Sequence, residues 1–460
     1  MRCLLFACLL LGSFSSFALD RFQVEGYTLP NGLQLLLKPG ADRGHVAIRL
    51  VIGVGLDDFS CEDKELPHLL EHLLFSGIDA TGEGGLEERM QALGGEWNAF
   101  TSNADTTFVI EAPAKNQRKV LDLLLALLSQ TRIDDNAINA AKQVVEREDG
   151  GHYTRLQRWL DRQDLGHTAS NQLAVELGLK CPERAEVDHL TREQLEKVRK
   201  LWYAPNNMTL IVVGDLERLL PAYLERAWGE LEAVDPSEHL PLPEIQTRAA
   251  HERTLSSGFV GGGAKLHWLV PEPVLADQQD ETFDLLKDYL DWALYRQMRL
   301  AHSLSYGPSA ERELFGGVGF MSLNADLERD DVPQAEQVLE ELKAQLLKDG
   351  LDADTFNRLK QAAIARQAWA VQGNSALADY YWSALGEYEN GRFANPAREL
   401  QGVTLEEANK ALRELLLQPG YLRIEKPLMG DDQLLWAIAG VLGLLLLGLL
   451  GWRLHRRTPP

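Results

Sequence analysis

Cysteine is scarce in this chain, which has four in 460 residues. Two of them, Cys3 and Cys8, lie in an N-terminal segment with the features of a cleaved signal. The other two, Cys61 and Cys181, can form at most one disulfide, which would require an oxidising compartment. Unpaired, buried thiols fit the sequence equally well, so the pairing stays open at this point.

Positive charge is also in short supply. The chain has 46 Lys and Arg residues against 68 Asp and Glu residues, a formal net charge of −22. Because binding to a phosphate backbone needs clustered Lys and Arg, this balance argues against a nucleic-acid partner. The acidity would suit basic or unfolded peptide substrates, although it more often serves solubility alone.

Long apolar runs occur at the two ends of the chain. Residues 1–18 contain one Arg, an apolar run from Leu4 to Leu11 and small residues up to Ala18. This order is typical of a signal peptide and predicts a mature chain that begins near Leu19. Lipid attachment at Cys8 is a weaker alternative, since the region before it is very short.

The C-terminal apolar run, residues 434–452, carries no charge and is long enough to span a bilayer. Asp431 and Asp432 precede the run, and three arginines lie in the tail, residues 453–460. By the positive-inside rule the tail is cytoplasmic and everything before the run lies outside. The sequence thus predicts a single-pass inner-membrane protein with its domains in the periplasm.

The second half of the chain repeats the first. The run Val120–Leu123 reappears as Val338–Glu341, and further similar pairs follow at the same offset of 338 − 120 = 218 positions. A constant offset of this kind predicts two tandem homologous domains, residues 19–230 and 245–427, joined by a linker at 231–244.

Apolar periodicity and turn residues predict an α+β fold for each domain. In the first half, strands are expected at 27–38 (with a turn at Asn31-Gly32), 45–54, 97–102, 106–112 and 209–213, and helices at 63–76, 86–93, 118–130 and 135–149.

The segment His68-Leu69-Leu70-Glu71-His72 lies on a predicted helix. Residues four apart share a helix face, so His68 and His72 can bind one metal ion. A catalytic zinc needs three protein ligands and an open position for water, and Glu71 is placed to take the proton of that water. This inverted zinc-protease motif predicts one Zn²⁺ per chain, with Glu71 as general base.

The third ligand must come from elsewhere, and the helix at 135–149 offers Glu146, Glu148 and Asp149. The repeat favours Glu148 as the ligand. At an offset of 218 the four proposed site residues are all replaced in the second copy, by Leu286, Tyr289, Leu290 and Arg366. Duplication followed by the loss of one site explains this pattern, and predicts an active first domain and an inactive second one.

These residues also carry a resemblance to the pitrilysin and insulinase family of zinc metallopeptidases. It covers nearly all of residues 20–427 and is closest in length to the two-domain branch that includes the mitochondrial processing peptidases. In that family the distal glutamate ligand follows a Val-Val pair, as Glu148 follows Val144-Val145. The resemblance rests on Leu29–Leu33, the zinc helix ending at Leu74–Gly77, Gly94-Gly95, Asn98–Thr101, Tyr203–Met208 and Val213–Asp215.

The resemblance implies two substrate-binding features. Asn98-Ala99 would lie on an edge strand that holds the substrate as an added β-strand. Arg299 and Tyr306, from the inactive domain, would stabilise the oxyanion or fix the peptide.

The chain departs from the family at two positions. Ala141 stands seven positions before Glu148, where a second glutamate is common. Ser303 stands where the family commonly has glycine. Neither departure removes a predicted zinc ligand.

The expected function is that of a membrane-anchored, extracytoplasmic zinc endopeptidase acting on peptides or unfolded segments. The family it resembles encloses peptides between four such domains, so a homodimer or a related second subunit is expected. One alternative is a non-catalytic peptide-binding or scaffold subunit, which would have lost the zinc residues. Another is a structural or storage zinc site, which would leave Glu71 without a role.

Overall fold

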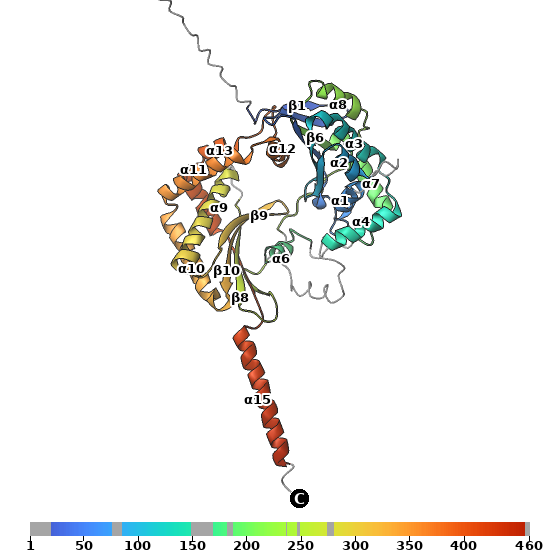
Figure 1. Cartoon of the computed structure of the whole chain (residues 1–460). Coiled ribbons are helices and arrows are strands. Elements are labelled where there is room, and N and C mark those ends of the chain that lie inside the picture. Colours follow the sequence, from blue (N-terminus) through green and yellow to red (C-terminus); the bar gives the residue numbers. More distant parts are fainter. Residues whose placement is uncertain are drawn as a thin grey trace, which may run out of the picture.

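The computed structural model describes residues 20–75, 85–148, 169–181, 187–235, 237–245, 249–273 and 280–455. Within these ranges the chain forms two mixed sheets, each covered by its own group of helices, and one isolated C-terminal helix (Figure 1). The predicted signal peptide lies outside the described residues.

The first sheet has six strands in the order β1-β2-β6-β3-β5-β4. Neighbours are antiparallel except β2 and β6, which are parallel. β6 is buried along its whole length because both faces of the sheet centre are covered, whereas β4 forms one edge. The strands are β1 (Glu25–Thr28), β2 (Gln34–Pro39), β3 (His45–Ile52), β4 (Glu96–Thr101), β5 (Thr106–Pro113) and β6 (Met208–Gly214).

One face of this sheet packs against helices that share a large apolar core. In α1 the leucines Leu69, Leu70, Leu73 and Leu74 are buried in that core, and Pro67 is accommodated in its first turn. The helices of this half are α1 (Leu66–Phe75), α2 (Leu86–Ala92), α3 (Gln117–Gln130), α4 (Asp135–Glu148), α6 (Ala169–Glu176), α7 (Arg192–Trp202) and α8 (Leu220–Trp228).

The second sheet has five strands in the order β7-β11-β8-β10-β9, which repeats the order β2-β6-β3-β5-β4 of the first. Its one parallel pair, β7 with β11, corresponds to β2 with β6. The strands are β7 (Glu252–Ser256), β8 (Gly263–Pro271), β9 (Ser309–Phe315), β10 (Val318–Glu328) and β11 (Tyr421–Lys426).

The helices of the second half preserve the spacing of the repeat: α11 begins 353 − 135 = 218 positions after α4. The chain is therefore built from two α+β units of one topology, as the sequence predicts. The helices are α9 (Asp280–Leu294), which continues into a π-helical turn (Tyr295–Ala301), α10 (Val332–Asp349), α11 (Ala353–Ala370), α12 (Asn374–Ser383), α13 (Pro396–Gly402) and α14 (Leu405–Leu417).

One helix of each half packs against the sheet of the other half (Figure 1). From the second half, α12 packs on the first sheet, where Leu377, Ala378 and Tyr381 join a buried cluster with strand residues such as Ile211. From the first half, α6 packs on the second sheet, and its Leu173 lies in a cluster with β-strand residues of that sheet. The exchange covers the sheet faces that the other helices leave open.

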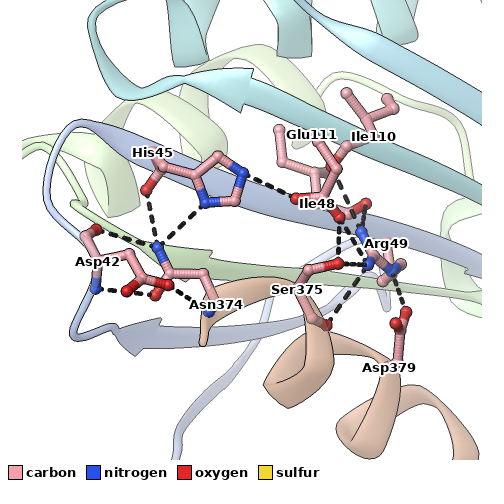
Figure 2. Close-up of polar contacts among 9 residues, drawn as sticks. All are labelled: Asp42, His45, Ile48, Arg49, Ile110, Glu111, Asn374, Ser375 and Asp379. Carbon is pink, nitrogen blue, oxygen red and sulfur yellow. Dashed lines mark hydrogen bonds and ion pairs between the residues drawn. The ribbon is translucent and has the colours of Figure 1, made fainter. Parts of the chain in front are cut away.

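A buried cation reinforces the contact between α12 and the first sheet. Arg49 on β3 is 1% exposed and donates from Nε to Asp379 of α12 (2.7 Å) and from Nη2 to Glu111 of β5 (2.8 Å). Figure 2 shows that Asn374, the first residue of α12, lies beside the β2–β3 turn, where its backbone N–H donates to Asp42 (3.0 Å). A paired charge at this depth fixes the register of the contact, since losing one partner would leave the other uncompensated.

The two cysteines whose pairing the sequence did not decide form a disulfide. Cys61 and Cys181 are 120 positions apart, with their Cα atoms at 5.5 Å. Cys61 lies in the loop that leads into α1, and Cys181 follows α6. The bond therefore ties the start of the predicted zinc helix to the segment that packs on the second sheet.

The C-terminal helix α15 (Asp431–His455) extends away from the second sheet (Figure 1). Its stretch Asp431–Leu450 is long and apolar enough to cross a membrane, and none of its most apolar window is buried against the rest of the described chain. It is therefore not a core helix, and its apolar surface needs another environment.

Candidate active site

Helices α1 and α4 bring the three predicted ligands together. His68 and His72 lie one turn apart on the face of α1 opposite its buried leucines, and Glu148 is the last residue of α4, which packs against α1. Nε2 of His72 is 3.1 Å from Nε2 of His68 and 3.1 Å from Oε2 of Glu148. Nε2 of His68 is 3.3 Å from the same carboxylate oxygen. The three atoms thus form a small triangle that could hold a metal ion.

The triangle has the dimensions of a zinc site. Nitrogen and carboxylate ligands at the usual zinc distances, in tetrahedral geometry, lie about 3.3–3.6 Å apart. The observed separations of 3.1–3.3 Å need only a slight expansion. Two imidazoles and one carboxylate also form a known set for a catalytic zinc, which keeps its fourth position for water. The residues present therefore fit this ion.

Glu71 lies beside the triangle without being part of it. Its side chain is buried, and its Oε2 accepts a hydrogen bond from the hydroxyl of Thr101 on β4 (3.2 Å). Burial raises the pKa of Glu71, against the opposing effects of His72, His68 and the Thr101 hydrogen bond. A buried carboxylate outside the ligand triangle is placed to take up and pass on a proton.

Glu65 is a site residue that the sequence interpretation missed. Its Oε2 lies 2.9 Å from Nδ1 of His68, so that Nδ1–H donates to the carboxylate. Burial lowers the pKa of His68, but the hydrogen bond and charge of Glu65, together with the charges of Glu71 and Glu148, outweigh it, and the net pKa is raised. Holding the proton on Nδ1 leaves the lone pair of Nε2 directed at the triangle. The only sequence signal was a carboxylate three positions before the first histidine.

We therefore expect Glu65→Ala to weaken zinc binding by about 10- to 100-fold, the usual cost of losing a partner behind a metal-ligating histidine. Glu65→Gln, whose amide oxygen can still accept from Nδ1, should lose less. Titration of each metal-free variant with zinc in competition with a chromophoric chelator measures the two zinc affinities. Glu62→Ala, an exposed residue of the same loop, is the matched control. Equal zinc affinity in Glu65→Ala and Glu62→Ala would show that Glu65 does not orient His68.

The predicted substrate strand lies next to Glu71. Asn98 and Ala99 are on β4, which pairs with β5 and, in the described part of the chain, ends the sheet. The side chain of Asn98 is exposed and accepts from the backbone N–H of Ala99 (2.9 Å). Because Thr101 at the end of this strand binds Glu71, a peptide added along the edge of β4 would run past the carboxylate.

Arg299 and Tyr306 contact each other in the second domain. Arg299 lies in the π-helical turn, donates to the backbone carbonyl of Tyr306 (2.7 Å) and has its guanidinium over the Tyr306 ring at 4.2 Å. The ring of Tyr306 is largely exposed. Within the described residues these contacts, and a further one with Tyr295, do not join the pair to the His68 triangle. The pair is preformed, but its role stays a prediction.

The two departures from the family pattern have different structural consequences. Ser303 has a φ of +54°, a left-handed conformation that favours glycine, so the backbone keeps the shape that the usual residue would adopt. Ala141 is buried in the core beneath α4 and offers no polar group to the site.

The fold and the paired imidazoles with a carboxylate define the class: an α+β metallopeptidase-like protein with one complete candidate site. Residues 40–183 match the model of the insulinase family (peptidase family M16), and residues 189–363 match that of the M16 inactive domain. Together the matches span well over half of the chain, and it belongs to the M16 peptidase family. The inactive-domain match begins before β6, so it includes elements that complete the first sheet.

Individual relatives agree with this assignment. An uncharacterized zinc protease of Bacillus subtilis, YmxG, is 21% identical over 419 residues, 88% of this chain and 98% of that protein. A probable mitochondrial-processing peptidase subunit beta of Arabidopsis thaliana is 28% identical over 190 residues, 41% of this chain and 35% of that one. The crystal structure of the periplasmic protease PqqL of Escherichia coli superposes with a TM-score of 0.67 at 20% identity, over 88% of this chain and 47% of that one. At that identity it supports the fold alone.

Proposed function

We propose that the chain is a zinc endopeptidase that hydrolyses peptides or unfolded protein segments. The observation that carries the proposal is the triangle of His68, His72 and Glu148 with the uncoordinated Glu71 beside it. Membership of a family whose curated relatives are named zinc proteases supports the same chemistry.

His68, His72 and Glu148 would hold one zinc ion, which when bound polarises the scissile carbonyl and lowers the pKa of a bound water. Glu71 would accept the proton of the attacking water and return it to the leaving amine. Thr101 keeps Glu71 in position by its hydrogen bond, and Glu65 keeps Nε2 of His68 facing the site.

The substrate would bind as an extended strand along the open edge of β4, the strand that carries Asn98 and Ala99, held by backbone hydrogen bonds. Main-chain recognition of this kind selects for unfolded segments, because a folded protein has few free strand edges to offer. Arg299 and Tyr306 would supply a cation and a phenol to the peptide or to the developing oxyanion.

A non-catalytic subunit is the second candidate, because the second domain has lost the site. At the equivalent positions Leu286 and Leu290 are buried in the core, the Tyr289 hydroxyl accepts from the N–H of Asp352, and Arg366 pairs with Asp288. A packed core and one ion pair have thus replaced the polar site there. The first domain has the complete set, His68, Glu71, His72 and Glu148, which favours catalysis.

We further propose that α15 anchors the domains on the periplasmic side of the inner membrane. An exposed apolar helix with arginines in the tail after it fits a single pass with a cytoplasmic C-terminus. The disulfide between Cys61 and Cys181 fits an oxidising compartment. Because this chain supplies two domains of the four expected around a substrate, a homodimer or a related subunit would complete the enclosure.

Metal removal tests the proposed activity. The purified protein should contain about one zinc per chain, since the described residues offer one such triangle. It should hydrolyse a fluorogenic unfolded peptide, lose that activity with a chelator, and regain it with added zinc. Bound zinc without any hydrolysis, across a library of unfolded peptides and with a partner subunit supplied, would favour the non-catalytic alternative.

A further inference from the structure

Three apolar side chains are exposed together at the base of α15. Phe259 is 74% exposed and Val260 41% exposed, in the turn between β7 and β8. Leu428 is 63% exposed, in the short segment between β11 and α15. Single exposed apolar residues are ordinary, but three of them on two hydrogen-bonded segments at the base of such a helix call for a partner.

Backbone hydrogen bonds hold this group in place. The N–H of Leu428 donates to the carbonyl of Gly258 (2.9 Å), and that of Met429 donates to Phe259 (3.0 Å). The N–H of Gly261 donates back to Met429 (3.1 Å), so Val260 and Met429 form a parallel bridge. The turn is thus fixed to the segment that enters α15 two residues later, and it cannot move independently of the start of that helix.

The height of the group relative to a bilayer follows from the helix. The apolar run begins at Leu434, five residues after Met429. The three steps within α15 rise about 4.5 Å, and the two steps before the helix add at most about 7 Å. The headgroup zone on each side of the hydrocarbon core is about 5–8 Å thick. Phe259, hydrogen-bonded to Met429, is therefore level with the headgroup zone when α15 spans the membrane.

The nearby charges favour a neutral lipid surface. Asp431 and Asp432 begin α15, and Asp330 is almost fully exposed beside Arg329, whose N–H donates to Gly262 of the same turn (2.7 Å). Carboxylates at this height repel anionic headgroups. Contact with the bilayer must therefore come from insertion of the apolar side chains and not from electrostatic attraction.

We propose that Phe259, Val260 and Leu428 form a second membrane contact, a tip that inserts among the lipid headgroups of the outer leaflet. The inference rests on the proposed anchor. A single helix lets the domains tilt, whereas a helix with an apolar tip at its side defines which face of the second domain meets the bilayer. Aromatic and aliphatic side chains lower their free energy by entering the interfacial zone. Because backbone hydrogen bonds already fix the tip, it can bind without rearranging.

Lipid quenching tests the tip and the anchor separately. Full-length protein carrying Phe259→Cys, Leu442→Cys or Leu219→Cys is labelled with an environment-sensitive fluorophore and placed in phosphatidylcholine nanodiscs. Lipids with spin labels near the headgroup or deep in the chains act as quenchers, and intact mass confirms one label per chain. Leu442 lies within α15. Leu219 is an exposed residue directly before α8, and α8 lies at the opposite end of the molecule from α15 (Figure 1).

The label at position 259 should lose fluorescence with the shallow quencher, that at 442 with the deep quencher, and that at 219 with neither. A label at 259 that behaves like the one at 219, while 442 is quenched, would overturn the tip and leave the anchor standing. An unquenched label at 442 would reject the anchor itself and the tip with it. Neither result depends on peptidase activity.

Discussion

Replacing Glu71 with glutamine should lower the kcat for peptide hydrolysis by about 100- to 10,000-fold, the usual contribution of a general base. The amide has nearly the same shape and can keep the hydrogen bond from Thr101, but it cannot accept the proton of the attacking water. Because Glu71 is outside the triangle of His68, His72 and Glu148, zinc content should not change. Turnover and zinc content are measured on the same preparation.

Two further variants give this result its meaning. Thr101→Val removes the hydrogen bond to Glu71 but keeps the carboxylate, so its loss of kcat should be smaller. Glu88→Gln, an exposed glutamate on α2, makes the same chemical change away from the site and should leave kcat unaltered. Near-normal turnover in Glu71→Gln would show that Glu71 is not the general base. Loss of zinc from Glu71→Gln would instead indicate that Glu71 is a metal ligand.

Local elements of the first domain were predictable because each depends on neighbouring residues. The helices expected at 118–130 and 135–149 are found at 117–130 and 135–148, where apolar residues recur with the helix period. The zinc helix begins at Leu66 and not at Asp63, since residues 61–65 form turns. The amphipathic helix α7 was not predicted, although its capping pair Thr191 and Gln194 was a usable signal.

Long-range pairings were beyond the sequence interpretation. A buried strand such as β6 reads as an apolar run, and nothing in the run says that it pairs with β2 on one side and β3 on the other. The exchange of α6 and α12 was unforeseen for the same reason, because an apolar helix face does not specify which sheet it covers. The repeat predicted two similar units but not how they hold each other.

The site residues that lie close together in the sequence were predictable, and the distant ones were less so. His68, Glu71 and His72 fall within one helical turn, and their spacing alone indicates a metal site. Glu148, 76 positions from His72, was chosen only through the repeat and the family resemblance. Partners defined by the folded backbone were not visible: Glu65 was overlooked, and Thr101 reaches Glu71 only because β4 packs beside α1.

The choice between the glutamates of α4 gives the second large expected effect. Glu148→Gln should weaken zinc binding by more than about 100-fold, beyond the cost of losing an outer partner, because a neutral amide replaces an anionic ligand. Oε2 of Glu148 lies 3.1 Å and 3.3 Å from the two imidazole nitrogens. Glu146, two positions earlier on the helix, points to a different side, where its charge acts on Lys142.

Glu146→Gln is therefore the matched control, an identical substitution on the same helix, and its zinc affinity should stay within about twofold of the parent, as for a surface change. Competition with a chromophoric chelator measures both variants, and peptide hydrolysis follows in parallel. In Glu148→Gln metal and activity should fall together, and excess zinc should restore part of the turnover. In Glu71→Gln activity should fall alone, and added zinc should restore nothing. If Glu146→Gln lost zinc while Glu148→Gln kept it, the third ligand would have to be reassigned to Glu146, and α4 would have to rotate to present it.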